Sequence, residues 1–543
     1  MSLTAPTRSY VAPAGVDAAA LVAALAERLD VAADQPTTGE ATVLDTADRR
    51  LRDAGLELRL GTGRSAGRLT LRDHPGAPPL AAEVPPEATR FLAPDLPAGP
   101  LRDRLAPVIE DRALLPLVRL RVEVRPLRVL DDEGKTVVRV AVATSTALGL
   151  PPSVPDTAPL AAMGPLDEPE HSDGPVDMRP ELDVAGVLGY PKPLARLTTL
   201  LADDLALSES NAGLADEAVA ALGGDPRGLR SKVEVHLHPA ERADEAAVTV
   251  LTELAGMVEA NLPGALADLD TEFVHDLRVA VRRSRSVLRE MKATFPPEPL
   301  ARHREGLKWI QTVTGDVRDL DVQLLDWDGL AERVAPDRRA AMAPVRTLLA
   351  ERRGAALTQL RRDLGSDRFN DVWVGYRLFL AGDLGPEDDR PAAATPIGKV
   401  AGRRIRKVYD RMLAMGGAID DASPPEALHE LRKRGKELRY LLELFGVLWP
   451  ADVVKPMVKT LKRLQDVLGL HQDRAVQIAH LGSLAPDLAV VPDGPDALLS
   501  LGALIDRLAA EQHEARADFA ERFAAFAAKD QQRLVHRTFR MPA

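Results

Sequence analysis

The chain has 543 residues, a formal net charge of −11 and no cysteine. This length exceeds one typical hydrophobic core, so we expect two or three domains. The lack of cysteine excludes a disulfide framework and a thiolate metal site, and it fits a reducing cytoplasm. The sequence has no run of about 18 apolar residues and no basic start followed by an apolar stretch, so we expect a cytoplasmic protein without a membrane span.

The first part of the chain alternates polar and apolar residues in short runs, which predicts β-strands. These runs are residues 43–46, 56–60, 68–72, 118–125 and 137–142. Charged residues on one face and Leu or Val on the other favour a barrel with a polar interior. We therefore predict an α+β fold. An N-terminal antiparallel β-barrel or tunnel-like domain precedes an all-α domain of two duplicated helical bundles.

The middle of the chain changes composition and then period. Residues 148–180 are rich in proline, alanine and acid, which predicts an insertion or long loop. A helix is expected at 194–205 and an extended piece at 233–238. From about residue 243 the apolar period becomes about 3.6 residues, which predicts helices. We predict one domain at 1–238 and a second at 240–535, with halves at about 240–381 and 396–535.

Two blocks of the helical region recur at one ungapped offset of 154 positions. The block that begins at His275 recurs at His429, and the block that begins at Leu307 recurs at Leu461. Two matches at the same offset are hard to obtain by chance. The helical region is therefore predicted to be an internal duplication whose halves are related by a pseudo-twofold axis.

A stripe of positive charge runs along both copies of the first block. On a helix of about 100° per residue, five residues of the first copy fall within an arc of about 80°: His275, Arg278, Arg282, Arg285 and Arg289. Segments 275–289, 429–439, 399–411 and 455–463 carry net charges of +4, +3, +5 and +4. One such stripe is more simply explained as a solvated face, since surface ion pairs contribute about 0–1 kcal/mol. Four stripes favour a bound polyanion that relieves their mutual repulsion.

The predicted polyanion site combines arginines, whose planar forks suit phosphate oxygens, with lysines that add positive potential. A histidine at the start of each stripe is expected to donate to the anion; alternatively, it ties the helix start to a neighbouring backbone group. The full set is His275, Arg278, Arg282, Arg283, Arg285, Arg289, Lys308, Lys399, Arg403, Lys407, His429, Arg432, Lys433, Lys436, Arg439, Lys455, Lys459 and Lys462.

Other ligands are less well supported by the same residues. Neither His275 nor His429 has a partner ligand three or four positions later, so no metal site is predicted. Aromatic residues make up 3% of the chain, whereas single-strand binders stack bases on aromatic platforms. Nucleic-acid binding is therefore expected to be weak and non-specific at most.

Two further equivalent pairs follow the second block. Gly315 and Gly469 are expected to stop helices. Asp319 and Asp473 are expected to orient a nearby arginine or lysine rather than to act as catalysts.

These motifs resemble the CHAD (conserved histidine α-helical domain) family. The resemblance covers about residues 240–535 and implies two four-helix bundles around a basic pore. It also implies binding of inorganic polyphosphate without a cofactor and, in some members, association with polyphosphate or storage granules. The run His471-Gln472-Asp473 departs from the family, which tends to place a small polar residue before the Asp. The matching runs are His275-x-x-Arg278-x-x-x-Arg282-Arg283-x-Arg285, Gly315-Asp-Val-Arg318-Asp319, His429-x-x-Arg432-Lys433-x-x-Lys436-x-x-Arg439 and Leu464-Gln465-Asp466.

The first domain resembles the CYTH (triphosphate tunnel) family on Asp45-Thr46-Ala-Asp48, Gly55-Leu-x-Leu-Arg59 and Arg230-Ser-Lys232. Active members hold a divalent metal through an E-x-E-x-K signature on the first strand. The equivalent stretch here is Ala5-x-Thr7-x-Ser9, and residues 138–145 have no acid either. The resemblance therefore implies a domain that lacks the metal site and is not an enzyme. Residual phosphate binding and a purely structural sheet stay open; the candidate phosphate ligands are Arg59, Arg68, Arg72, Arg119, Arg121 and Arg125.

The sequence thus predicts a non-enzymatic polyphosphate-binding protein, acting as a granule adaptor or scaffold and located in the cytoplasm or on granules. The alternative is a metal-dependent triphosphatase that acts through the N-terminal tunnel. A nucleic-acid binder is a third hypothesis, and it requires binding that outcompetes polyphosphate.

Overall fold

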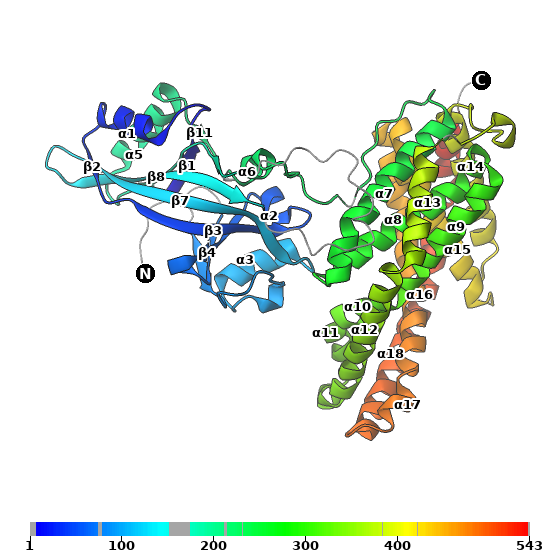
Figure 1. The fold of residues 1–543 in the computed structure, drawn as a ribbon. Coiled ribbons are helices and arrows are strands. Elements are labelled where there is room, and N and C mark those ends of the chain that lie inside the picture. The colour runs from blue at the N-terminus through cyan, green and yellow to red at the C-terminus, as the bar shows by residue number, and fades with distance from the viewer. Residues whose placement is uncertain are drawn as a thin grey trace. The chain divides into compact units, whose positions relative to one another are not determined.

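The computed structural model describes residues 7–73, 79–150, 174–210, 214–230, 232–382, 384–420 and 422–540. Their contacts form two units: the residues before 232 together with Ala267–Glu272, and the remaining residues. The predicted α+β class is confirmed, with an antiparallel sheet in the first unit and helices in the second (Figure 1). Residues 151–173, most of the predicted insertion, lie outside the described residues.

The first unit is built on one antiparallel sheet of the strands β1 (Thr7–Val11), β2 (Val31–Ala33), β3 (Thr37–Thr46), β4 (Glu57–Thr62), β5 (Arg68–Arg72), β6 (Leu80–Glu83), β7 (Leu114–Leu130), β8 (Thr136–Gly149), β9 (Val176–Asp177), β10 (Glu181–Gly186) and β11 (Ser208–Glu209). The strand order is β11-β1-β10-β8-β7-β3-β4-β5-β6, with β2 on β7 and β9 on β8. Within the described residues this path does not close on itself, so the sheet is a half-barrel.

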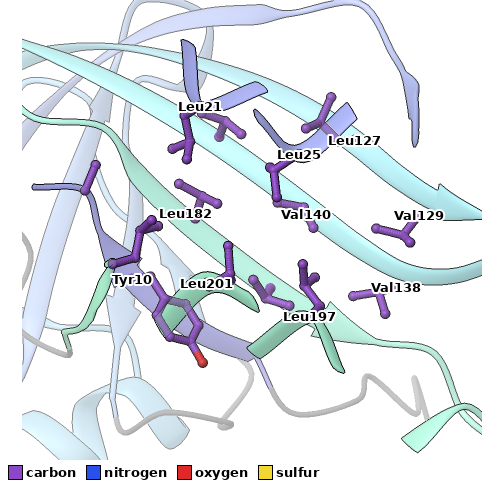
Figure 2. Close-up of a cluster of buried hydrophobic side chains, with 14 of the residues drawn as sticks. Tyr10, Leu21, Leu25, Leu127, Val129, Val138, Val140, Leu182, Leu197 and Leu201 are labelled. Atoms are coloured by element: carbon purple, nitrogen blue, oxygen red, sulfur yellow. The ribbon is translucent and has the colours of Figure 1, made fainter. Parts of the chain in front are cut away.

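Short helices cover the outer face of this sheet because apolar residues alternate along its strands. Leu21 and Leu25 of one helix and Leu197 of another pack against Val140 and Leu182 of two strands (Figure 2). Alternation places the residues on either side of Leu182 on the opposite, inner face. The helices on this face are α1 (Ala18–Ala26), α2 (Arg50–Asp53), α3 (Pro100–Ile109) and α5 (Pro191–Thr199) with the π-helical turn Leu200–Asp204. In contrast, α6 (Ala215–Ala221) packs against Val43 and Val118, on the opposite face of the sheet.

All five predicted strand runs lie in strands, apart from Leu56, which directly precedes β4. The helix predicted at 194–205 corresponds to α5 and its π-helical turn. Strands β2, β6, β9, β10 and β11 were not predicted, and the stretch that the CYTH resemblance equates with a first strand overlaps β1. The extended piece predicted at 233–238 belongs to no strand.

The second unit is built from helices. Along the described chain no helix is both long enough and apolar enough to cross a membrane. The helices are α7 (Ala243–Ala267), α8 (Thr271–Glu290), α9 (Pro297–Val313), α10 (Gly315–Leu325), α11 (Trp327–Glu332), α12 (Ala343–Leu364), α13 (Asp367–Ala381), α14 (Ile397–Gly417), α15 (Pro425–Phe445), α16 (Ala451–Gly482), α17 (Ala485–Leu488), α18 (Gly494–Phe526) and α19 (Lys529–Thr538).

The helix boundaries follow the sequence duplication. Helices α14, α15 and α16 each begin 154 positions after α7, α8 and α9. Pro296 and Pro450, equivalent in the two copies, directly precede α9 and α16. Proline is tolerated at a helix start because the first backbone N–H groups of a helix have no partner within it.

The two copies differ at one point in this pattern. The first copy is interrupted at Thr314, where α9 ends and α10 begins, whereas α16 runs through the equivalent region without a break. The prediction that Gly315 and Gly469 stop helices is therefore wrong. Neither glycine has the left-handed conformation of a helix-ending residue; Gly315 opens α10 and Gly469 lies inside α16.

Part of the core is shared between the copies. Leu320 and Leu330 from the first copy pack in one buried cluster with Leu481 and Leu504 from the second. The C-terminal parts of the two copies therefore pack against each other: α10 and α11 of the first copy contact the end of α16 and α18 of the second.

Candidate anion-binding site

The two predicted basic stripes lie on α8 and α15, whose apolar faces are buried. On α8 the core residues include Leu277, Val281 and Leu288, and on α15 they include Leu431 and Leu438. The stripe residues lie beside these positions and are half-buried, except Arg289 and Lys433, which are exposed. The amphipathic period that forms each helix thus holds its cations at the edge of the core.

Arg282 and Lys436 occupy equivalent positions, 154 residues apart, and they lie within electrostatic range of each other. Burial lowers the pKa of Lys436 to about 8, with further contributions from Arg432 and Arg282, while Asp473 partly offsets them. Neither Arg282 nor Lys436 forms an ion pair among the described residues, and the buried Nε of Arg282 has no hydrogen-bond partner. The centres of the two stripes are therefore close enough to repel each other, and no carboxylate is ion-paired with either residue in this part of the described chain.

Two cross-copy ion pairs flank this centre. Arg283 Nη2 of α8 lies 3.1 Å from Glu443 Oε2 of α15, and Arg289 Nη2 of α8 lies 3.7 Å from Glu437 Oε2 of α15. The offset of 154 relates Arg283 to Glu437 and Arg289 to Glu443, so the two pairs are equivalent in the two copies with their charges reversed. Arg439 also binds Glu443, with its Nε 2.5 Å from Oε1. These pairs join α8 to α15.

The arginines that begin the two stripes have different partners. Arg278 Nη1 donates to the carbonyl oxygen of Gln311 at 2.8 Å and to Thr314 Oγ1 at 2.9 Å, at the end of α9. Its equivalent, Arg432, instead donates to Asp473 at 2.9 Å. Burial, together with Arg282 and Arg318 and despite Asp319, lowers the pKa of Arg278 to about 10.

Arg285 extends the basic stripe of α8 toward α9. Its pKa is lowered, first by burial and then by Arg289 and by Arg304 of α9, while Glu305 opposes the shift. Arg285 forms no ion pair among the described residues. An anion in contact with this group would stabilise its charged form.

The histidines differ in what the structure reveals of their surroundings. His429 Nδ1 lies 2.6 Å from Gln472 Oε1, so this histidine ties α15 to α16. The partner is a side chain and not the backbone group of the structural alternative, and the contact leaves the second ring nitrogen for an anion. His275 lies in the first turns of α8, where its ring and the carboxylates of Glu272 and Asp276 come within 4.8 Å of one another. Glu272, one turn before His275, thus provides a nearby carboxylate that spacing to later positions does not reveal.

The remaining predicted cations lie on exposed surfaces. Lys308 is near Glu305, at 3.4 Å, and Lys433 is near Glu430, at 2.6 Å, on their own helices. The other members form no ion pair with α8 or α15 within the described chain. They are Lys399, Arg403 and Lys407 on α14, and Lys455, Lys459 and Lys462 on α16.

The inner face of the half-barrel carries charges that the sequence reading missed. Arg59 Nε lies 2.7 Å from Glu57 on β4, and Arg59 Nη2 lies 3.4 Å from Glu181 on β10. Arg72 on β5 lies 2.9 Å from Asp183 on β10. Since β4 and β10 are separated by three strands in the sheet order, these contacts cross the interior of a curved sheet.

The prediction that the later strands lack acidic residues on this face is therefore wrong. Residues 138–145 of β8 indeed carry no acid, but acidic residues lie on β4 and on the unpredicted strand β10. Burial raises the pKa of Glu181 despite the nearby Arg59. Of the other candidates, Arg121 lies 3.1 Å from Glu40, and Arg68 and Arg119 are exposed. Arg125 lies 3.5 Å from Glu123. Of the stretch Ala5-x-Thr7-x-Ser9, Ala5 lies outside the described residues.

The second unit is thus a duplicated helical domain whose equivalent helices α8 and α15 carry matching basic stripes. Residues 249–482 match the family model of the CHAD domain, and this region of the chain is a CHAD domain. That finding confirms the family resemblance of the helical part. The sheet architecture is consistent with a tunnel-like domain, although no comparison names the CYTH family.

The chain is also similar to uncharacterised proteins of Mycobacterium tuberculosis. Uncharacterized protein MT2285 of strain CDC 1551 and Uncharacterized protein Rv2226 of strain H37Rv are each 29% identical to it over 213 residues. The match covers 39% of this chain and 40% of each relative, so the chain spans about two fifths of the length of these relatives.

Two solved structures resemble the chain at low identity. The CHAD domain from the plant Ricinus communis has 22% identity and a TM-score of 0.47, covering 55% of this chain and 96% of that one. PptA from Streptomyces chartreusis has 20% identity and a TM-score of 0.42, covering 52% of this chain and 99% of that one.

Proposed function

We propose that the helical domain binds inorganic polyphosphate along the paired basic stripes, the six cations Arg278, Arg282, Arg285, Arg432, Lys436 and Arg439. The observation that carries the proposal is the pair Arg282 and Lys436, equivalent cations that lie within electrostatic range of each other and form no ion pair among the described residues. A linear phosphate polymer supplies closely spaced anionic oxygens that match this arrangement.

The electrostatics of the stripes support an anionic ligand. Burial and neighbouring cations lower the pKa of Arg278 and of Lys436, so charging these groups costs free energy in the unliganded protein. A bound polyanion removes that cost because each phosphate oxygen offsets the mutual repulsion. CHAD domains are linked to polyphosphate in general, and this chain contains one.

The test is binding of long-chain polyphosphate across a salt series, with single-stranded DNA as competitor. The variant Arg282→Gln with Lys436→Gln should lower the affinity at least about 30-fold and flatten the salt dependence. Lys433→Gln is the matched control, since Lys433 lies on α15 like Lys436 but is exposed and paired with Glu430. Equal loss in the control, or displacement of polyphosphate by DNA of equal charge, would contradict the proposal.

A granule adaptor or scaffold in the cytoplasm is the cellular role that follows from such binding. One long polymer can hold several protein chains at once, since each occupies only part of its length. Microscopy of the tagged protein in cells with and without polyphosphate tests this role. Recruitment to granules should disappear in the Arg282→Gln, Lys436→Gln variant.

The second candidate function, a metal-dependent triphosphatase in the half-barrel, is favoured by the inner-face acids Glu57, Glu181 and Asp183. Opposing it, Arg59 and Arg72 already contact these acids. Release of phosphate from triphosphate with Mg²⁺ or Mn²⁺, abolished by Glu181→Gln, would support the enzyme. Absence of release with both metals would support a non-enzymatic domain.

A further inference from the structure

Two buried carboxyl groups lie beside the paired basic stripes. Glu290 is the last residue of α8 and Glu437 lies in the middle of α15, and their side chains are 1% and 4% exposed. Both carboxyl groups contact the same arginine, Arg289, and each raises the electrostatic cost of ionising the other. Two ionised carboxylates buried beside one another repel, so the pair favours a state in which one of them keeps a proton.

Three arginines surround the pair, one from each helix packed against it. Arg289 of α8 donates from Nε to Glu290 at 2.7 Å, and its Nη2 lies 3.7 Å from Glu437. Arg404 of α14 donates from Nε to Glu290 at 3.0 Å. Arg434 of α15 donates to Glu437 at 2.6 Å. Among the described residues, these three arginines are the charged groups in contact with the pair. The net charge of the cluster is therefore one unit more positive when one carboxyl group is protonated.

The contacts determine which carboxyl group keeps the proton. Burial alone would raise the pKa of Glu290, but hydrogen bonds from Glu437, Arg404 and Arg289 lower it to about 2. For Glu437, burial and the neighbouring Glu290 raise the pKa to about 7, against the opposing effect of Arg289 and Arg434. Glu290 is thus the ionised member and Glu437 the protonated one in mildly acidic solution.

The pair is connected to the anion site through Arg289. This arginine contacts both carboxyl groups and lies within electrostatic range of Arg285 in the stripe. When Glu437 ionises, Arg289 gains a second full ion-pair partner and the positive potential around Arg285 falls. Both effects weaken the attraction for an anion.

We propose that the Glu290–Glu437 pair regulates the anion site by its shared proton, holding Arg289 away from the ligand when the proton is lost. The inference rests on the proposed function and adds its regulation. Polyphosphate therefore binds more tightly in mildly acidic than in mildly alkaline solution. Titration of Glu437 causes this pH step, the change in affinity between the two conditions.

The experiment measures the affinity of the full chain for long-chain inorganic polyphosphate at about pH 6 and about pH 8.5, on either side of the Glu437 titration. All proteins carry Lys436→Arg, whose guanidinium stays charged and so removes the titration of Lys436 itself. The parent protein should bind about fivefold more weakly at the higher pH. The Glu437→Gln variant keeps a neutral hydrogen-bonding side chain at both pH values and should change less than about twofold.

Glu443→Gln is the matched control, since Glu443 lies on the same helix, contacts Arg283 and Arg439, and has no carboxyl partner recorded. Because Glu443→Gln removes a negative charge beside Arg283 and Arg439, it should raise the affinity for polyphosphate at both pH values. The difference in affinity between the two pH values should remain. Arg289→Gln is a second variant that leaves the carboxyl pair in place; it should lower the affinity and flatten the step. A full pH step in both Glu437→Gln and Arg289→Gln would overturn the regulation.

A thermal-unfolding series separates failure of the regulation from failure of the proposed function. If the parent protein binds polyphosphate equally at both pH values, the regulation fails and the proposed function stands. If the parent protein does not bind at either pH, while Glu437→Gln raises the unfolding midpoint only at the higher pH, the carboxyl pair holds its proton but both the proposed function and its regulation fail.

Discussion

Arg282 and Lys436 occupy the same position of the two copies, 154 residues apart, and they lie within electrostatic range of each other. Their charges add rather than cancel at the point where the copies meet. Because the two positions are equivalent, a cation in one copy is matched by a cation in the other. The duplication thus concentrates positive charge that a single copy would hold only once.

Arg282→Gln and Lys436→Gln should each weaken polyphosphate binding by about tenfold, or about 1.4 kcal/mol. The losses should be similar because the two positions are equivalent around the ligand. Affinities from calorimetry or fluorescence anisotropy check this. A large loss in one variant and none in the other would indicate that only one copy contacts the polymer.

Binding should take up a proton on the alkaline side of neutrality. The pKa of Lys436 is about 8 in the unliganded protein, and a polyanion raises it by favouring the charged ammonium. Calorimetric titrations in buffers of different ionisation heat measure the uptake. Lys436→Met should abolish most of it, whereas Lys433→Met should leave it unchanged.

The stability of the unliganded protein should rise as pH increases above about 8. Folding lowers the pKa of Lys436, so between its folded and unfolded values the unfolded chain binds more protons. Denaturant unfolding across this range checks the sign. Lys436→Met should remove the rise, and an unchanged rise in that variant would assign it to other groups.

Glu290→Gln should destabilise the fold by about 3 kcal/mol, because it leaves Arg289 and Arg404 without their buried carboxylate. Glu430→Gln breaks an exposed pair with Lys433 on α15 and should cost less than about 0.5 kcal/mol. Urea unfolding at neutral pH compares the two variants. Similar costs would show that the buried network contributes no more than a surface pair.

Reversing the exposed cations of α14 should affect binding less than changing the central pair. Lys399, Arg403 and Lys407 form no ion pair with α8 or α15 in the part of the chain described. The triple change to Glu should therefore lower the affinity mainly at low salt, where long-range attraction acts. A loss at physiological salt as large as that of Lys436→Gln would place α14 in direct contact with the polymer.

The sequence predicted the repeat well because periodicity and offset are local properties of the chain. The equivalent blocks at His275 and His429 lie on α8 and α15 as expected, and the helix starts repeat at the same spacing. Which arginine meets which carboxylate could not be predicted, since such contacts depend on how two helices cross. Arg404 and Glu290 are 114 positions apart, and no pattern in either helix points to the other.

The half-barrel was harder to predict for a different reason. The acids Glu181 and Asp183 lie on a short strand whose neighbours in the sheet are distant in sequence. An alternating run of a few residues is too short to distinguish a strand from a loop. Its position between β1 and β8 is decided by the whole sheet.

The helix break at Thr314, absent from the second copy, gives the two equivalent arginines Arg278 and Arg432 different structural roles. Arg278 closes the exposed carbonyl end that the break creates, at Gln311. Arg432 faces an unbroken helix with no such end and pairs with Asp473 instead. Replacing Arg278 would therefore leave a helix end without its side-chain donor, whereas replacing Arg432 would remove one ion pair and leave the helix it faces intact.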